Sequence, residues 1–256
     1  MQHDIEFTRT TPFAHKAPEA PTPLEAKVAA LNATFKTAGA RSVLKASLDG
    51  ADIGRVALVS SFGADSVVLL HMASIIDKSL PVIFIDTEML FHETLVYQAQ
   101  LTIDLGLWNV RIIRPDEHEV NARDPKGDLY QRSTKACCTL RKTRPLSRAL
   151  EGFDGWITGR KRFQSGTRAQ LDYFEAEEDT GRIKVNPLAH WSLDDIKAYM
   201  EANDLPRHPL ISKGFPSIGC APCTSKVADG EDPRSGRWRG SDKTECGIHL
   251  GKGSPA

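Results

Sequence analysis

The sequence predicts an α/β fold with a doubly wound, mostly parallel β-sheet. Two observations lead to this prediction. Short apolar, β-branched runs alternate with longer helical segments from residue 55 to residue 159. Small and polar residues follow several of these runs, and open parallel sheets bind ligands at the carboxyl ends of their strands. At 256 residues, the chain is long enough for one sizeable core of this kind.

Five strands are expected. A parallel strand that is buried on both faces is a short, continuous apolar run, and residues 55–61 and 81–87 have that character. The predicted strands cover residues 55–61, 81–87, 108–113, 155–159 and 182–188.

Helices are expected between the strands and at both ends of the series. The predicted helical segments are residues 23–46, 66–77, 92–105 and 139–150. A further helix is expected to begin near Ser192, because Ser192 to Asp195 has a capping-box pattern.

The chain divides into three parts by composition. Residues 1–25, rich in Pro, Ala and Thr, are expected to form a loose N-terminal lead. Residues 26–228 hold the predicted α/β domain. Residues 229–256 are polar, charged and Gly-rich at first, so we expect a flexible C-terminal tail.

The charge balance excludes some classes of partner. The 33 basic and 33 acidic residues give a formal net charge of +0, which argues against nucleic acid or an anionic membrane surface as a general partner. No apolar run approaches the ~20 residues that span a bilayer, and the N-terminus does not resemble a secretory signal. We expect a cytoplasmic protein that forms a homo-oligomer, although sequence does not fix its subunit number.

The segment from Ser60 to Ser66 joins the first strand to the first helix of the sheet. Its small residues allow backbone N–H groups to approach a phosphate, and the helix N-terminus favours an anion there. It lacks the Gly-Lys-Ser/Thr ending of a Walker motif. An ordinary strand–helix turn is the alternative. The candidate binding residues are Ser60, Ser61, Phe62, Gly63, Asp65 and Ser66.

Thr87 and Phe91 follow the second strand at its carboxyl end. Backbone groups there are suited to read an adenine edge, and Phe91 to pack on a ring. A helix cap with a core phenylalanine explains the same residues equally well.

Four of the five cysteines form two close pairs, Cys137-Cys138 and Cys220-Ala-Pro-Cys223. In a cytosolic chain, such pairs favour metal binding or catalysis over structural disulfides. Thiolates suit zinc or an iron–sulfur cluster, and adjacent cysteines argue against the usual spacing of zinc ligands. The ligand chemistry favours a [4Fe-4S] cluster; zinc, or cysteines buried as small apolar residues, are the alternatives.

Cys246 stands apart from both pairs, close to Arg234, Arg237 and His249. Nearby cations lower the pKa of a thiol and so make it a better nucleophile. An incidental cysteine in a disordered tail is the alternative.

Residues 160–168 are rich in arginine and follow the fourth predicted strand. Arginine binds sulfate and phosphate groups through paired N–H donors, so this segment is a candidate for anion binding. A solvated basic surface is the more common explanation of such a stripe.

Taken together, these motifs resemble a known family. The loop at Ser60–Ser66 resembles the PP-loop of the ATP pyrophosphatases and sulfonucleotide reductases, with Phe62 in place of the first glycine. The segments around Cys137-Cys138 and Cys220 to Cys223, and the Glu-Cys-Gly-Ile-His motif at 245–249, resemble those of assimilatory adenylyl-sulfate reductases. The similarity runs from about Ser60 to Leu250.

The resemblance implies a fold, a cofactor and an activity. The fold is the PP-loop, adenine nucleotide alpha hydrolase-like type. One [4Fe-4S] cluster per subunit binds the four paired cysteines. Cys246 attacks adenosine 5'-phosphosulfate, and thioredoxin or a glutaredoxin-like dithiol completes the reduction. The implied substrate ligands include Lys142, Arg162, Ser165, Arg168, Arg234, Arg237 and His249. Phe163 departs from the acidic residue that the family pattern leads us to expect.

Three other functions compete with this one. A reductase of 3'-phosphoadenylyl sulfate shares the loop but usually lacks the four paired cysteines. A PP-loop enzyme that uses ATP to thiolate tRNA also carries clusters, yet the neutral charge and the C-terminal motif oppose it. The third is a non-catalytic zinc-binding adapter.

Overall fold

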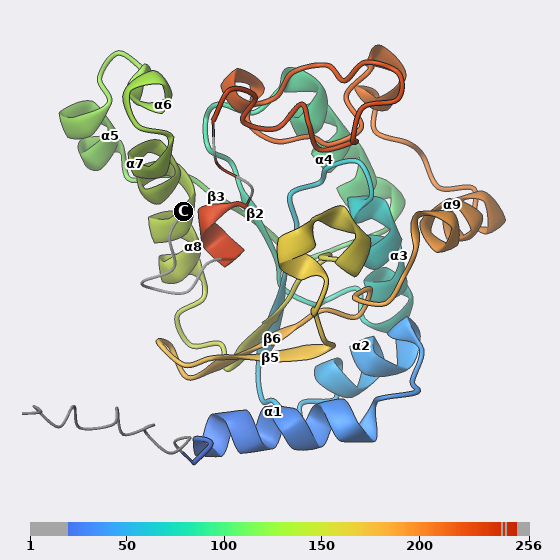
Figure 1. Ribbon diagram of the computed structural model, residues 1–256. Helices are drawn as coiled ribbons and strands as arrows, with labels where there is room; N and C mark the ends of the chain where they lie inside the picture. Colours follow the sequence, from blue (N-terminus) through green and yellow to red (C-terminus); the bar gives the residue numbers. More distant parts are fainter. Residues whose placement is uncertain (1–19, 242, 244, 250–256) are drawn as a thin grey trace, which may run out of the picture.

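Figure 1 shows the computed structural model, which describes residues 20–241, 243 and 245–249. Within these residues, six strands form one sheet in the order β3-β2-β1-β4-β6-β5. The strands are β1 (Val56–Val59), β2 (Val82–Ile85), β3 (Val110–Ile113), β4 (Gly155–Ile157), β5 (Phe174–Glu177) and β6 (Arg182–Val185). All neighbouring pairs are parallel except β5 and β6. The predicted fold class is therefore confirmed.

The helices lie on both sides of the sheet (Figure 1). They are α1 (Pro23–Thr34), α2 (Ala40–Leu48), α3 (Ser66–Ile76), α4 (His92–Asp104), α5 (Glu117–Arg123), α6 (Leu129–Arg132), α7 (Thr134–Cys138), α8 (Arg144–Ala149) and α9 (Leu193–Ala202). The capping box expected at Ser192 is present, with Ser192 Oγ accepting a hydrogen bond from the backbone N–H of Asp195 at 3.1 Å.

The first predicted helix, residues 23–46, is in fact two helices. α1 ends at Thr34, and α2 begins after Gly39, which is its N-cap and has an extended backbone. The chain therefore changes direction between two helical segments that the sequence pattern alone had joined.

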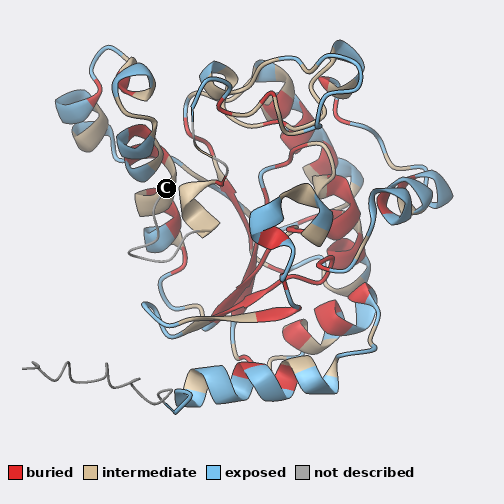
Figure 2. Ribbon diagram, viewed as in Figure 1, coloured by how far each residue is buried: buried red, intermediate tan, exposed pale blue. Residues whose placement is uncertain are grey.

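Alternate residues of the central strands supply two separate cores. Val56 and Leu58 of β1 belong to the larger cluster, with side chains from α2, α3, α4 and α9, whereas Ala57 belongs to a smaller cluster with Leu146 of α8. This division follows from the two-residue period of a strand. Figure 2 shows the buried positions concentrated in the sheet and on the inner sides of the helices.

The strand order creates a binding crevice. β1 lies between β2 and β4, so the chain leaves the middle of the sheet in both directions. Loops at the carboxyl ends of two such strands diverge and leave room for a ligand. The loops in question are the Ser60–Ser66 segment after β1 and residues 158–168 after β4.

β4 has almost no room for a side chain at its first residue. A Cβ added at Gly155 would lie 2.6 Å from the carbonyl oxygen of Ile183 and 2.7 Å from Cγ2 of Ile53. Glycine at this position lets β4 approach β6 and the segment before β1, which brings the two loops of the crevice together.

Part of the segment 229–256, expected to form a flexible tail, contacts the body of the protein, while residues 229–233 and 239–241 are exposed. The backbone N–H of Trp238 donates to the carbonyl of Cys223 at 3.0 Å, and Trp238 is buried. The N-terminal lead lies almost wholly outside the described residues. Among the helices that are described, none is both long enough and apolar enough to cross a membrane.

Candidate active site

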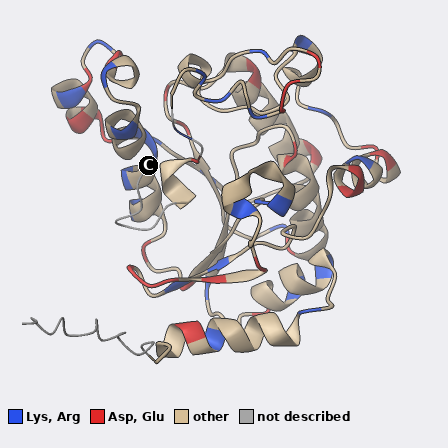
Figure 3. Ribbon diagram, in the orientation of Figure 1, with Lys and Arg blue, Asp and Glu red and all other residues tan. Residues whose placement is uncertain are grey.

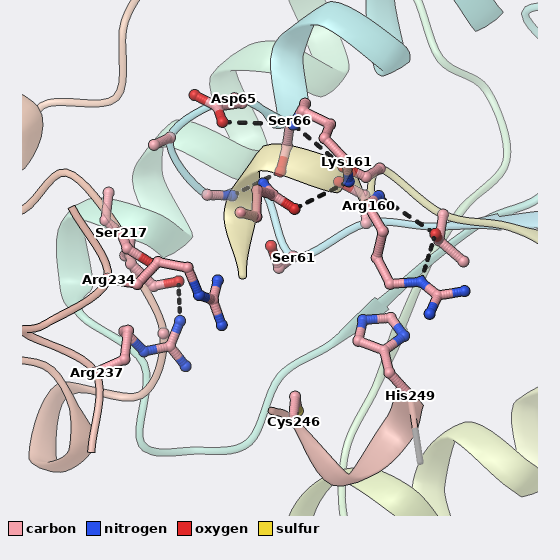
Figure 4. A pocket seen from close by; sticks show the side chains of 18 of the residues that line it. Ser61, Asp65, Ser66, Arg160, Lys161, Ser217, Arg234, Arg237, Cys246 and His249 are labelled. Carbon is pink, nitrogen blue, oxygen red and sulfur yellow. Dashed lines mark hydrogen bonds and ion pairs between the residues drawn. The ribbon is translucent and has the colours of Figure 1, made fainter. Parts of the chain in front are cut away.

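A cavity of about 390 Å³ lies at the carboxyl ends of β1 and β4. It is lined by the loops after both strands, by residues 216–219 and by the C-terminal segment (Figure 4). Six of its lining residues are cationic and three are acidic. The cations are Lys142, Arg160, Lys161, Arg168, Arg234 and Arg237. The lining therefore suits an anionic ligand.

This excess of positive charge is local. Figure 3 shows Lys and Arg scattered over the fold together with Asp and Glu, as the neutral net charge requires. The chain thus concentrates cations at one cavity without a basic surface, which agrees with the absence of a global polyanion signal.

The loop after β1 is held by its own serines. Ser60 Oγ accepts a hydrogen bond from the Phe62 N–H at 3.1 Å, and Ser66 Oγ accepts one from the Gly63 N–H at 2.9 Å. α3 starts at Ser66, so its N-terminus faces the same cavity. These bonds fix the loop beside the N-terminus of α3, and phosphate binding there stays a prediction.

Phe62 serves the core rather than the cavity. Its side chain is fully buried and packs edge-on against Phe84, with ring centroids 5.3 Å apart. Its backbone φ of 48° is unusual for a bulky residue, and the buried ring offsets that strain. The positive φ shapes the loop, while the Phe62 side chain lies outside the cavity lining.

The loop after β4 brings two cations to the opposite wall. Lys161 Nζ lies 3.4 Å from Oδ2 of Asp65 and donates to the carbonyl of Gly159 at 3.1 Å. Burial lowers the pKa of Lys161, and Asp65 opposes that effect. Arg160 is held by Glu175 of β5 and by Asn186, whose Oδ1 is 3.1 Å from Nη2. Neither residue was singled out from the sequence.

The four paired cysteines meet beside this cavity. Cys137 and Cys138 end α7, and the backbone of Cys220 forms an isolated bridge with Leu90. Burial, together with the neighbouring Cys138, Cys220 and Cys223, raises the pKa of Cys137 to about 12. All five cysteines are free thiols. The two sequence-distant pairs therefore form one group of sulfurs.

Two polar side chains contact this group. Thr87 Oγ1 lies 3.2 Å from Cys220 Sγ, and Lys243 Nζ lies 3.3 Å from Cys138 Sγ. Burial alone raises the pKa of Cys220, but Lys142 and the Thr87 hydroxyl outweigh it, and the net shift is downward. Cys220 is therefore the thiol of the group most prepared to be a thiolate.

Lys142 links the cysteine group to Cys246. It lies in a π-helical turn, Thr139–Thr143, directly after the adjacent cysteines. Burial lowers the pKa of Lys142, but Cys220 and Cys246 raise it more, so its pKa is above the usual value. Lys142 therefore stays protonated at neutral pH and interacts with both the paired cysteines and Cys246.

Arg141, which belongs to the same turn, does not line the cavity and forms contacts elsewhere. Arg141 is buried, and its guanidinium contacts Oδ2 of Asp124 at 3.0 Å and donates to the carbonyl of Thr87 at 3.1 Å. π-Helical turns often occur at functional sites, because one extra residue per turn changes which side chains share a face.

Arg234 and Arg237 form a third wall of the cavity (Figure 4). Arg237 is fixed, since Nη1 donates to the carbonyl of Ile218 at 3.1 Å and the guanidinium lies 4.5 Å from the ring centroid of Trp238. Burial, together with the nearby Arg168 and Arg237, lowers the pKa of Arg234 to about 10. Such a shift indicates that the arginines repel one another, and an anionic ligand would reduce that repulsion.

Cys246 lies at the base of the cavity with His249 beside it (Figure 4). The ring of His249 stacks on Trp156, with centroids 5.8 Å apart and planes 6° apart. Burial lowers the pKa of His249, and Arg160 and Arg168 lower it further, so the imidazole is neutral. Its Nδ1 is buried and has no hydrogen-bond partner among the described residues.

Glu245 holds the residue next to the thiol. Its two carboxylate oxygens accept hydrogen bonds from Arg168 at 2.6 and 2.7 Å, and Oε1 also accepts from the N–H of Cys246 at 2.8 Å. Burial raises the pKa of Glu245, but the bonds and charge of Arg168 outweigh it, and the net shift is downward. Glu245 is therefore a carboxylate at neutral pH.

The structure brings most of the predicted substrate residues to one cavity. Ser60, Ser61, Gly63, Asp65, Ser66, Lys142, Arg168, Arg234, Arg237, Cys246 and His249 line it. Five predicted residues have their side chains elsewhere: Phe62 in the core, Thr87 against Cys220, Phe91 against Phe215, Arg162 on Asp172, and Ser165 on Thr167.

Sequence reasoning missed Arg160, Lys161, Gln164 and Glu245. The first three lie in the predicted basic loop, where composition did not tell which side chains turn inward. Glu245 stood in the C-terminal motif beside Cys246, and that adjacency was a signal that could have identified it.

The comparison with protein families is decisive at this point. The phosphoadenosine phosphosulfate reductase domain matches residues 55–226. The chain belongs to this family. The adenosine 5'-phosphosulfate reductase of Chelativorans sp. (strain BNC1) is 49% identical over 90% of this chain and 94% of that protein. The reductase of the same name from Mesorhizobium japonicum is 50% identical over 88% of each chain.

Solved structures agree with the fold. The phosphoadenylyl-sulfate reductase from Candida auris is 26% identical, with a TM-score of 0.68 over 82% of this chain and 99% of that one. The Candida glabrata FMN adenylyltransferase in complex with FMN and an ATP analogue is 16% identical, with a TM-score of 0.54 over 84% of this chain and 73% of that one. The second likeness concerns the fold alone.

Proposed function

We propose that this protein reduces adenosine 5'-phosphosulfate to sulfite and AMP, with electrons from a dithiol protein such as thioredoxin. One observation carries the proposal: the Cys246 thiol, outside the cysteine pairs, lines the same cavity as the phosphate-type loop and six cations. The names of the relatives at 49–50% identity support the same substrate.

The first step is a displacement at sulfur. The Cys246 thiolate attacks the sulfate sulfur, an S–S bond forms, and the bond from sulfur to the bridging oxygen breaks. AMP leaves with that oxygen and the electron pair. The cations of Lys142, Arg234 and Arg237 offset the charge that grows on the leaving phosphate and on the sulfonate oxygens.

The second step releases sulfite and regenerates the free Cys246 thiol. One thiolate of the dithiol attacks Sγ of Cys246, so the S–S bond to the sulfonate breaks and sulfite departs with its electron pair. The second thiol of the donor then attacks the mixed disulfide and frees Cys246. The donor loses two electrons and becomes a disulfide, which balances the reduction of sulfate to sulfite.

The cysteine group fits a [4Fe-4S] cluster by its chemistry. Cys137, Cys138, Cys220 and Cys223 are four free thiols that perturb one another. The described residues contain no set of three or more His, Cys, Asp or Glu side chains arranged for a single metal ion. Four cysteine thiolates are the usual ligands of such a cluster, and a zinc ion is the alternative.

The bound cluster would supply a fixed charged neighbour to Lys142, and no change of its redox state is required for two-electron thiol chemistry. Iron and acid-labile sulfide in anaerobically purified protein test this assignment. Four irons and four sulfides per chain are expected; one zinc and no sulfide would contradict it.

The substrate assignment is tested by assaying adenosine 5'-phosphosulfate and its 3'-phosphorylated form side by side, with sulfite as the readout. We expect strong preference for the first. The family description and the Candida auris reductase keep the second as the rival, so an equal or reversed preference would overturn this part. A cytoplasmic location and a homo-oligomer remain part of the proposal.

The role of Cys246 is tested by Cys246→Ser. Turnover should vanish, because a hydroxyl is a poor nucleophile toward sulfate sulfur, while AMP binding and cluster content stay as in the wild type. Intact-mass measurement should detect one added SO₃ group on the wild-type chain and none on the variant. Turnover retained by the variant would refute the assignment.

A further inference from the structure

The ion pair between Arg168 and Glu245 fastens the reactive segment to the body of the protein. The two residues are 77 positions apart in the chain. Arg168 Nε and Nη2 donate to separate oxygens of the carboxylate, and the two side chains are only 7% and 6% exposed. Paired, charge-assisted bonds of this kind are among the strongest and most directional in proteins.

The carboxylate also fixes the backbone of the nucleophile. Oε1 of Glu245, the oxygen that Arg168 Nη2 contacts, accepts the N–H of Cys246. Any movement of the carboxylate therefore moves the residue that carries the thiol. Arg168 in turn bonds Gln164 of its own loop, so the far end of the pair is anchored to the segment after β4.

The other contacts of this segment, among the described residues, are packing contacts with the core and with the turn at Thr139–Thr143. Ile248 packs against the smaller core cluster, and His249 stacks on Trp156. Both contacts are made by uncharged groups and lack the directionality of the ion pair. Among the described residues, Arg168 is the cation that neutralises Glu245 directly.

We propose that Arg168 and Glu245 form a latch that seats the segment 245–249 with Cys246 in the cavity, so that Arg168 is a positioning residue for the nucleophile and not a substrate ligand. This inference rests on the function proposed above. The seated state serves attack on the nucleotide; release of the latch exposes the sulfonated Cys246 to the dithiol.

The latch predicts a division between the two half-reactions. Arg168→Lys keeps the charge but loses the paired geometry, and Glu245→Gln keeps a carbonyl for the Cys246 N–H but loses the ion pair. Each should slow formation of the SO₃ adduct about tenfold or more, since hydrogen bonds to charged groups are lost in the seated state. Neither should slow release of sulfite by the dithiol.

Two further readouts separate a latch from a binding role. In a Cys246→Ser background, Glu245→Gln should leave the Kd for adenosine 5'-phosphosulfate within about twofold, because its carboxylate bonds to Arg168 and to the Cys246 N–H. In the Cys246 enzyme, the double variant should be no slower than either single one, as expected for two residues that act as a unit.

Hydrogen exchange of the amides at 245–249 gives a measurement independent of activity. Protection should fall in both latch variants and stay unchanged in the control Glu231→Gln. Glu231 forms a comparable pair with Arg239 in the same part of the chain, with both carboxylate oxygens bonded, but outside the cavity.

Two results would overturn the latch. One is unchanged protection at 245–249 in both variants whose thermal unfolding matches the wild type. The other is a tenfold weaker Kd in Arg168→Lys but not in Glu245→Gln, which would make Arg168 a substrate ligand. Absence of an SO₃ adduct on the wild-type enzyme would refute the proposed function, while the exchange measurement still decides the latch.

Discussion

Two buried arginine–carboxylate pairs in this protein have similar chemistry but different surroundings. Arg141 and Asp124 are 6% and 0% exposed, and Arg168 and Glu245 are 7% and 6% exposed. The first pair sits in a network: Asp124 also accepts the N–H of Leu129 at 2.8 Å, and Arg141 also bonds the carbonyl of Thr87. The second joins one loop to a short terminal segment.

The difference teaches that context decides what a buried ion pair does. Where other bonds hold both partners, the pair can open only if the surrounding structure opens. Where one partner lies on a segment with few other contacts, the pair can open locally while the rest of the fold stays intact. The comparison predicts that the Arg141–Asp124 pair opens only when the surrounding fold opens. The Arg168–Glu245 pair is expected to open locally, without unfolding of the rest.

The largest expected effect is on the free energy of unfolding. Asp124→Asn removes the buried carboxylate that pairs with Arg141 and leaves it only the half-exposed Glu88, at 3.1 Å, so the protein should lose about 3 kcal/mol of stability. Glu245→Gln should lose about 1 kcal/mol or less, since the segment can move into solvent. Urea unfolding of the holoprotein measures both.

The control for this experiment is Asp128→Asn, which breaks an exposed pair with Arg132 at 2.9 Å and should change stability by about 1 kcal/mol at most. Equal losses in Asp124→Asn and Glu245→Gln would remove the distinction between the two pairs.

The second effect sharpens the comparison at the site itself. Arg141 anchors the π-helical turn that presents Lys142 to the cavity. Lys142→Gln should lower kcat/KM by about 10²–10³, the usual loss when one stabilising donor is removed from a developing anion. Unfolding by urea should change little.

Lys135→Gln is the matched control, because Lys135 lies on the same helical segment but is exposed and outside the cavity lining. A loss of activity in Lys135→Gln as large as in Lys142→Gln would attribute the effect to the helix and not to the cation.

The smallest effect concerns a buried, uncharged histidine, His208, and its two hydrogen bonds. His208 is buried, Nδ1 accepts the N–H of Leu210 at 3.1 Å, and Nε2 therefore donates to Thr94. Burial lowers the pKa of His208 to about 4. Its folded pKa is below the unfolded value of about 6.5, so its contribution is complete above pH 6.5 and is lost as pH falls toward 4.

This group alone should therefore remove about 2 kcal/mol of stability between pH 7 and pH 5. His208→Gln should flatten that part of the profile relative to wild type, whereas His118→Gln, at an exposed position, should leave it unchanged. A wild-type profile that is level from pH 7 to pH 5 would contradict the assignment.

The fold was largely predictable because local and long-range signals agreed. Short runs rich in apolar and β-branched residues predicted β1, β2, β3 and β4, and the segment 182–188 was also expected to be a strand and contains β6. β5 was missed: its sequence Phe-Glu-Ala-Glu has half-exposed glutamates, and it pairs antiparallel at the sheet edge, where a weak apolar pattern suffices. The single predicted helix at 139–150 hid a π-helical turn, which periodicity does not resolve.

The site was predictable where position along a strand end was enough. Ser61, Asp65 and Ser66 follow β1 directly, and their places come from the strand–helix connection itself. Arg162 and Arg168 show where that reasoning stops. Both lie in one basic loop, but two short 3₁₀ turns direct Arg162 outward to Asp172 and Arg168 inward to Glu245. Only tertiary contacts choose between them.

The π-helical turn constrains how this chain can vary. Between Thr139 and Thr143, the number of residues matters more than most of their identities, because each residue rotates a helix by about 100°. Deletion of one residue would let the segment continue as an ordinary α-helix. The side chains after the deletion would then be rotated about the helix axis relative to those before it. Substitutions can accumulate in such a stretch, but a change of length would move Lys142 away from the group of paired cysteines.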